Sequence, residues 1–269
     1  MERRRVLGLL RQPSWIGLTL VVIMLGITFT ELGLWQLRRH DERAAANALL
    51  VANLAAAPVA VTDLLPADQP LPGADEWRAV TASGVYDPEQ EVLVRNRSYE
   101  GELGYEVVTP LVPSTGPAVL VLRGWVPNGS SAATVPAVPS APGGEVVVTA
   151  RLRPTPTGGI DATGLPAGQV RQLAVPVLAG SLPYEVLEGG YAQLVVGAPG
   201  SDAGLAGPRA LTAPEPNAGP HLPYAVQWFL FGVIAIGGWG VLLRAGLREE
   251  PGARPHAVRE RPPVAVGPR

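Results

Sequence analysis

Two long runs without a charged residue lie near opposite ends of the chain. Residues 12–30 form a run of 19, and residues 222–243 form a run of 22. As helices they would extend roughly 28 and 33 Å, which matches the hydrocarbon core of a bilayer. Aromatic residues typical of a membrane–water boundary lie near the ends of both runs: Trp15, Trp35, Tyr224 and Trp239. The pattern predicts two transmembrane helices.

The arginines beside these runs predict an orientation. Four precede the first run and five follow the second, whereas only four lie on the inner flanks. Because positive charge close to a span favours the cytoplasmic side, we expect both termini in the cytoplasm and the central region outside. A retained anchor is favoured over a cleaved secretory signal, since the first run exceeds the usual 7–15 residues or so of a signal core.

The segment after the first run predicts a continuing helix. Residues 34–57 lack Gly and Pro and are rich in helix-forming residues, and Pro58 would end the helix. The expected organisation is therefore a cytoplasmic N-tail at 1–11, a transmembrane helix at 12–37 continuing to about 57, an outer domain at 58–220, a second transmembrane helix at 221–243, and a disordered cytoplasmic tail at 244–269.

The central region has the pattern of a β domain. Short Val- and Leu-rich runs separated by Gly, Pro and Asn predict strands at 80–86, 91–97, 105–111, 119–126, 145–153 and 192–196. Residues 170–179 suggest a short helix, and residues 197–220 read as a linker. The predicted fold is a membrane protein in which two transmembrane α-helices flank a mainly β extracytoplasmic domain, barrel- or sandwich-like.

Composition removes several classes of function. The net charge of −2 argues against nucleic acid as a partner, and the lack of Cys excludes thiol nucleophiles, disulfides and Cys-bound metal or iron–sulfur sites. Lys is absent and all 21 basic residues are Arg, which together with abundant Ala, Gly and Pro indicates a coding bias of a bacterial kind. The three His are far apart and form no zinc-hydrolase motif.

Two groups of residues could carry chemistry, and each also has a plain structural interpretation. His221 lies at the start of the second span, where a neutral imidazole could bind haem iron or could simply be an interfacial side chain. Trp228, seven residues on, could pack on a macrocycle or on the other helix. In the first helix Trp35 and Arg39 share a face beside Gln36 and could hold an anionic group, or could anchor the helix at the interface. Glu31 could pair with a nearby Arg or be a functional carboxylate.

Five segments in order resemble the Surfeit locus protein 1 family of cytochrome c oxidase assembly factors. They are LGLWQLRR at 32–39, VLVRNRSYEGELGYEVVTPLV at 92–112, VLVLRGWVP at 119–127, GGYAQLV at 189–195 and NAGPHLPYAVQWF at 217–229. Asn217 and His221 are four residues apart rather than the family's two. His221, Tyr224, Ala225, Gln227 and Trp228 match the family pattern directly.

The resemblance implies a function and a site. It implies a non-enzymatic factor in the bacterial cell membrane that aids haem a delivery to, or stabilises, the oxidase core subunit. Transiently bound haem a would have its iron on His221, with Trp35, Gln36, Arg39 and Trp228 as further cofactor-binding residues. Expected partners are the core subunits of cytochrome c oxidase, the enzyme of haem a synthesis and membrane lipids.

Two other functions remain open from the sequence. The chain could be a stable accessory subunit of an oxidase or respiratory supercomplex that binds no haem. In that case the glycines of the second run would permit close helix packing. An extracytoplasmic sensor or membrane-anchored hydrolase is the other alternative, although the short tails and the lack of a catalytic motif argue against it.

Overall fold

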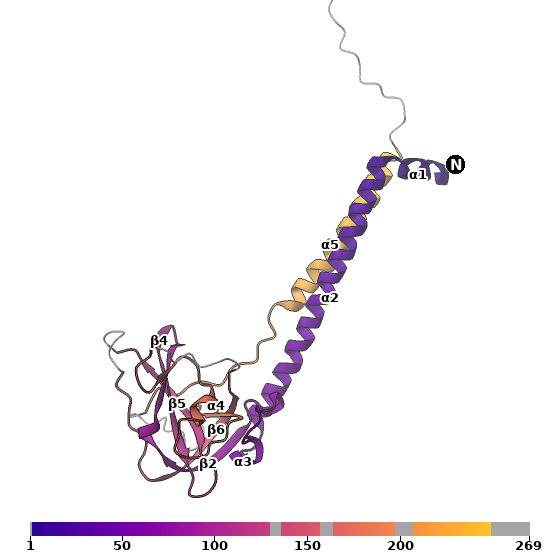
Figure 1. Ribbon diagram of the computed structural model, residues 1–269. Coiled ribbons are helices and arrows are strands. Elements are labelled where there is room, and N and C mark those ends of the chain that lie inside the picture. Colours follow the sequence, from indigo (N-terminus) through magenta and orange to yellow (C-terminus); the bar gives the residue numbers. More distant parts are fainter. Residues whose placement is uncertain (1, 130–135, 157–163, 197–206, 249–269) are drawn as a thin grey trace, which may run out of the picture. The chain divides into compact units, whose positions relative to one another are not determined.

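The computed structural model describes residues 2–129, 136–156, 164–196 and 207–248. It divides into two compact units. The helical unit comprises Met1–Arg43 and Ala218–Arg269, and the β unit comprises Ala44–Asn217. Figure 1 shows the helices and strands of both, and each unit is described by itself. The fold prediction of two apolar helices flanking a mainly β domain is confirmed.

The helical unit contains three helices: α1 (Glu2–Leu10), α2 (Pro13–Ala55) and α5 (His221–Gly246). Pro13 begins α2, a position where the missing N–H costs nothing. α2 and α5 are both long and apolar enough to cross a membrane, and their most apolar windows are hardly buried by the protein itself. The sequence pattern does not predict α1, because residues 1–11 are expected only as a cytoplasmic N-tail.

The first part of α2 and α5 pack side by side and antiparallel (Figure 1). At one end of the pair the Trp239 indole N–H donates to Thr19 Oγ1 at 3.1 Å. Further along, the rings of Phe29 and Trp228 stack with centroids 5.8 Å apart. As the residue number rises in α2, that of its partner falls in α5.

Five strands of the β unit close into a mixed barrel. They are β2 (Ala79–Tyr86), β6 (Glu145–Pro154), β8 (Gly190–Gln193), β5 (Val119–Pro127) and β4 (Glu102–Val112). They pair in that order, and β2 also pairs with β4, which completes the ring. The β5–β8 pairing is parallel and the other four are antiparallel. Beyond β4 lie β3 (Val92–Tyr99) and β7 (Gln169–Val170), and β1 (Val59–Ala60) lies beside β2.

Alternation along the strands divides the core into two main clusters and a smaller third one of Leu93, Tyr105, Val107 and Val126. One cluster takes residues from every barrel strand, among them Val80, Val148, Ala192, Val121 and Leu111, so it fills the interior. A second cluster uses the opposite face of β4 and β5 and packs under β3, β7 and the short helix α4 (Val175–Ala179). The short helix α3 (Val61–Leu64) follows β1, and two 3₁₀ turns, η1 (Gly73–Asp75) and η2 (Pro88–Gln90), precede β2 and β3.

Five of the predicted strands coincide with β2 to β6, whereas the other local predictions need correction. The sixth strand is β8, which begins two residues earlier than predicted. The predicted helix at 170–179 is helical only at Val175–Ala179, and Val170 belongs to β7. Within the predicted linker, Arg209 and Leu211 form β-bridges to Trp125 and Val195. Of the tail predicted as disordered at 244–269, residues 244–246 belong to α5, and the part beyond 248 lies outside the described residues.

The end of α2 is held in the β unit by two polar side chains, one buried and one half-buried. Asn53 is 5% exposed, and its Nδ2 donates to the carbonyls of Ala74 and Glu76 at 2.7 and 2.8 Å. Arg151 of β6 donates to the carbonyls of Asn53, Leu54 and Trp77 at 3.0–3.3 Å. The last carbonyls of a helix lack partners within it and carry its negative dipole end, so a guanidinium suits this position. Burial lowers the pKa of Arg151 below its usual range.

Replacement of Arg151 by Met removes these donors and keeps the apolar stem. Since three main-chain carbonyls lose a charged donor, we expect the free energy of unfolding to fall by about 2–3 kcal/mol and the Tm by about 5–10 °C. The measurement is thermal unfolding of the full chain in detergent. Arg171→Met is the matched control, because Arg171 is exposed and forms no ion pair with the described residues. An equal loss in both variants would contradict the assignment.

Candidate functional site

His221 and Gln36 meet between the two long helices. His221 is the first residue of α5, and Gln36 lies in α2. The imidazole Nδ1 lies 2.9 Å from Gln36 Oε1, and both residues are half-buried. Residues 185 positions apart thus form one polar pair. The sequence placed both among the candidate site residues, and the structure brings them into contact.

This contact decides which nitrogen of His221 has a free lone pair. A glutamine oxygen only accepts hydrogen bonds, so Nδ1 carries the proton and donates it to Gln36. The neutral ring then has its lone pair on Nε2, which forms no hydrogen bond with the residues that the structure describes. Metal-binding histidines commonly have this arrangement, with one nitrogen donating to a fixed acceptor and the other binding the metal.

The turn before α5 sets the position of the imidazole ring. Gly219 has a φ of +65°, a conformation that favours glycine. A Cβ placed on it would lie 3.2 Å from both Cδ2 and Nε2 of His221, so the ring packs directly against this glycine. Pro220 precedes the helix and Pro223 lies in its first turn, where no helical N–H bond is lost.

Trp35 and Arg39 do not form the stacked pair that the sequence suggested. Arg39 Nη1 forms an ion pair with Glu42 Oε2 at 2.6 Å instead, and both side chains are largely exposed. Arg39 takes part in no cation–π contact among the described residues. Trp35 is 47% exposed. Both residues lie within about one helical turn of Gln36, so they are near the pair without contacting it.

Trp228 packs within the helix pair. Its ring stacks on Phe29 at 24° and meets Phe231 edge-on at 83°, with centroids 5.8 Å apart in both contacts. Phe29 and Phe231 also contact each other, with centroids 5.9 Å apart. Trp228 lies two helical turns, about 10 Å, along α5 from His221. Its observed contacts are therefore those of a helix-packing aromatic residue.

Gly33 is the residue whose role the sequence did not show. It is buried, and a Cβ on it would lie 2.7 Å from Cε1 and Cζ of Phe229. The missing side chain thus makes room for the Phe229 ring between the two helices. A glycine inside a helix costs about 1 kcal/mol relative to alanine, and this cost was the available signal of a packing role.

A groove of about 570 Å³ is lined by residues of α2 and α5. Its walls include Gly26, Thr30 and Ile236, and Trp239 and Glu31 border it. Thr30 Oγ1 donates to the Gly26 carbonyl at 2.8 Å, which satisfies the hydroxyl inside the helix. Glu31 forms no ion pair with the described residues, contrary to the pairing that the sequence favoured.

Comparison with known proteins places this arrangement in a family. The model of the SURF1 family matches residues 23–233, which include all five candidate residues. The chain belongs to the SURF1 family. It is 35% identical over 266 residues to an uncharacterized SURF1-like protein of Mycobacterium bovis and to one of Mycobacterium tuberculosis, covering 93% of this chain and 92% of each relative. The SURF1 family is linked to cytochrome oxidase assembly and is not known for enzymes.

Substitution of Gly33 by Ala tests the packing of the Phe229 ring against Gly33. The added methyl collides with Phe229, so we expect the free energy of unfolding to fall by about 1–3 kcal/mol. The measurement is thermal unfolding in detergent, monitored through the near-UV circular dichroism signal of the aromatic side chains. Gly17→Ala is the control, since nothing lies within 4 Å of a Cβ there and the helix gains propensity. A rise in stability for both variants would rule out the steric role.

Proposed function

We propose that this SURF1-family chain is a membrane-bound assembly factor that receives haem a and aids its delivery to the core subunit of cytochrome c oxidase. The observation that carries the proposal is the His221–Gln36 hydrogen bond of 2.9 Å. It leaves the lone pair of Nε2 available to a metal on a half-buried ring. Family membership supplies the link to the oxidase.

The residues present fit haem as cargo. A porphyrin provides four of the iron ligands itself, so one histidine is enough to bind it. His221 would be that axial ligand, and Gln36 would fix its tautomer. Among the described residues no group of three or more His, Asp or Glu could hold a metal ion without a macrocycle. A single protein ligand also suits cargo that must be released.

The three other candidate residues have different parts in this proposal. Arg39 would hold a propionate group of the haem, for which that carboxylate must displace Glu42. An exposed ion pair contributes at most about 1 kcal/mol, so the exchange is easy. The exposed Trp35 ring would lie against the macrocycle. Trp228 would act indirectly, because it holds the two helices together through Phe29 and Phe231.

The groove between the helices favours a second candidate function, that of a stable accessory subunit. Its glycine and threonine walls would allow the backbone of a partner's transmembrane helix to approach closely. The most apolar windows of α2 and α5 are also almost uncovered within the chain. In this function the two helices would pack against the oxidase core without haem.

The membrane arrangement is part of the proposal. α2 and α5 would both cross the bacterial cell membrane, with both termini in the cytoplasm and the β unit outside. The Arg asymmetry and the apolar lengths of the helices support this arrangement. The His221–Gln36 pair, at the start of α5, would then lie at the outer boundary of the membrane, where an amphipathic macrocycle is readily held.

Visible spectra of the detergent-purified protein, co-expressed with haem a synthesis, test the proposal. We expect haem a with the wild type, loss or a shift of the reduced-state band with His221→Ala, and about 10–100-fold weaker retention with Gln36→Leu. Gln12→Leu is the matched control, because Gln12 is an exposed glutamine that directly precedes α2. This variant should bind haem a normally.

Failure of the haem proposal has a distinct signature. If neither the wild type nor His221→Ala holds haem while mature oxidase subunits co-purify in fixed stoichiometry, the accessory-subunit function is correct instead. In that case His221 is an interfacial contact only.

Cysteine labelling tests the orientation, and the chain is suited to it because it has no Cys of its own. Arg171→Cys lies on an exposed position of the β unit, and Ala257→Cys lies in the C-terminal tail. With an impermeant maleimide we expect intact cells to label Arg171→Cys only, and permeabilised cells to label both. Labelling of Ala257→Cys in intact cells would refute the orientation.

A further inference from the structure

The groove lined by α2 and α5 ends at a carboxylate that the haem proposal does not use. Glu31 lines this groove and is exposed. It is the only charged residue between positions 12 and 37, and no charged residue lies between 222 and 243. A carboxylate at the edge of a hydrocarbon span is costly without a partner, so such a residue is a candidate binding site.

Glu31 has no counter-ion in the part of the chain that the structure describes. It forms no ion pair or hydrogen bond with those residues. Side chains one helical turn apart are neighbours on a helix surface, and here positions 27–28 and 34–35 carry no charge. A cation for this carboxylate would therefore come from another molecule.

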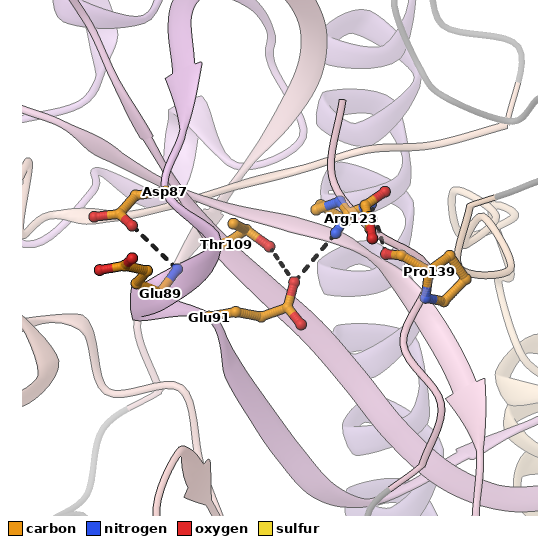
Figure 2. Close-up of polar contacts among 7 residues, drawn as sticks. Asp87, Glu89, Glu91, Thr109, Arg123 and Pro139 are labelled. Carbon is orange, nitrogen blue, oxygen red and sulfur yellow. Dashed lines mark hydrogen bonds and ion pairs between the residues drawn. The ribbon is translucent and has the colours of Figure 1, made fainter. Parts of the chain in front are cut away.

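A carboxylate of the β unit shows the contrast (Figure 2). Glu91 Oε2 accepts hydrogen bonds from Thr109 Oγ1 at 2.9 Å and from Arg123 Nη1 at 3.2 Å. Arg123 also donates from Nη2 to the carbonyls of Pro139 and Ser140. The charge of Glu91 is thus compensated inside the fold, whereas that of Glu31 is not.

The groove is long and narrow. Its lining follows α2 from Thr19 to Glu31, which is about 18 Å along the helix axis. One leaflet contributes half of the ~30 Å hydrocarbon core, so this length is close to that of one acyl chain. A volume of about 570 Å³ over this length gives a mean cross-section of about 30 Å², much less than that of a helix ~10 Å thick. The shape therefore favours an acyl chain over a partner's helix.

The walls of the groove are apolar and uncovered by the rest of the chain. Ile23, Ile27 and Ile236 line it, and each is more than half exposed. Gly26 deepens the wall, because nothing lies within 4 Å of the position where its Cβ would be. Burial of such side chains against a hydrocarbon chain needs no polar contact.

The other polar groups along the groove have partners within the protein. Thr30 Oγ1 donates to the Gly26 carbonyl at 2.8 Å, and the Trp239 indole N–H donates to Thr19 Oγ1 at 3.1 Å. Thr19 and Trp239 are the lining residues farthest from Glu31, so their hydrogen bond joins the two helices at the opposite end. Glu31 is thus the polar group that the groove offers to a ligand.

We propose that the groove holds one acyl chain of a phospholipid whose ammonium headgroup, as in phosphatidylethanolamine, binds the Glu31 carboxylate. Glu31 lies one helical turn from Trp35, an aromatic residue of the kind found at the level of lipid headgroups. An ammonium group brings a positive charge and N–H donors, so it forms a charge-assisted hydrogen bond with a carboxylate. A second, parallel copy of this chain would instead bring a like charge, another Glu31, to the same level.

The test measures which lipids stay with the full chain. The protein is placed in nanodiscs of equal amounts of phosphatidylethanolamine and phosphatidylglycerol with identical acyl chains. The lipids that remain bound after extraction into detergent are then quantified by mass spectrometry. We expect about tenfold enrichment of phosphatidylethanolamine, because phosphatidylglycerol has no cation for Glu31. Equal retention of the two lipids, or of neither, would overturn the proposal.

Glu31→Gln tests the headgroup contact, because it removes the charge and keeps the size of the side chain. We expect this variant to lose the enrichment. Asp41→Asn is the matched control, since Asp41 is an exposed carboxylate of α2 that does not line the groove, and it should retain the enrichment. Undiminished enrichment in Glu31→Gln would refute the assignment of Glu31.

Gly26→Leu tests the groove itself by filling it. The new side chain starts in open space and leucine favours a helix, so we expect the Tm to stay or rise while the bound lipid is lost. Gly17→Leu is the matched control, because its Cβ position is equally open and lies outside the groove. Unchanged lipid retention in Gly26→Leu would overturn the proposal, and a change from dimer to monomer in that variant would identify a second copy as the occupant.

This inference rests on the membrane crossing in the proposed function, but it uses neither haem nor the oxidase. The haem spectra depend on His221 and Gln36, neither of which lines the groove, so either proposal can fail without the other. A wild type that retains no lipid while oxidase subunits co-purify would instead place a partner's helix in the groove.

Discussion

Closure of the barrel rests on a very short stretch of pairing. β2 meets β4 through only two residue pairs, Val85 with Val112 and Tyr86 with Leu111. Gly84 makes this approach possible, since a Cβ on it would lie 2.5 Å from the Val112 carbonyl oxygen. A ring has no exposed edge among its members, so the five strands bury one continuous interior. The remaining strands are then left on the outside, where β3 and β7 cover a second core.

The anchor of α2 depends on this division of faces. Arg151 alternates with the interior residues Ala150 and Leu152 along β6, so it points outward to the carbonyls of α2. This outward position is occupied by a half-buried charged group, and hydrogen bonds to the carbonyls offset its loss of water.

The sequence predicts elements well where one local signal dominates. Uncharged runs of 19 and 22 residues have few alternatives to a membrane-length helix, and β-branched runs such as those of β5 and β6 indicate strands. β7 has only two residues, and β8 begins with a glycine, so neither has a pattern of its own. Barrel and sandwich differ here by the β2–β4 contact alone, which joins distant residues and leaves no periodic signal.

The candidate site shows the same limit. The sequence makes His221 and Gln36 candidates separately, but their contact spans 185 residues and only the structure shows it. Helical spacing alone suggested that Arg39 meets Trp35, and it left open whether Trp228 packs on a macrocycle or on the other helix. The structure pairs Arg39 with Glu42, three residues away, and packs Trp228 on Phe29 of the other helix. The choice among several available neighbours is a tertiary property.

The identity of the acceptor at His221 bears on how cargo would be released. Many metal-binding histidines donate to a carboxylate, which raises the basicity of the ring and strengthens the metal bond. Gln36 fixes the same tautomer with a neutral oxygen, so it orients Nε2 without adding negative charge. Under the proposed function, the pair would therefore orient His221 toward its cargo without the added basicity that a carboxylate acceptor gives.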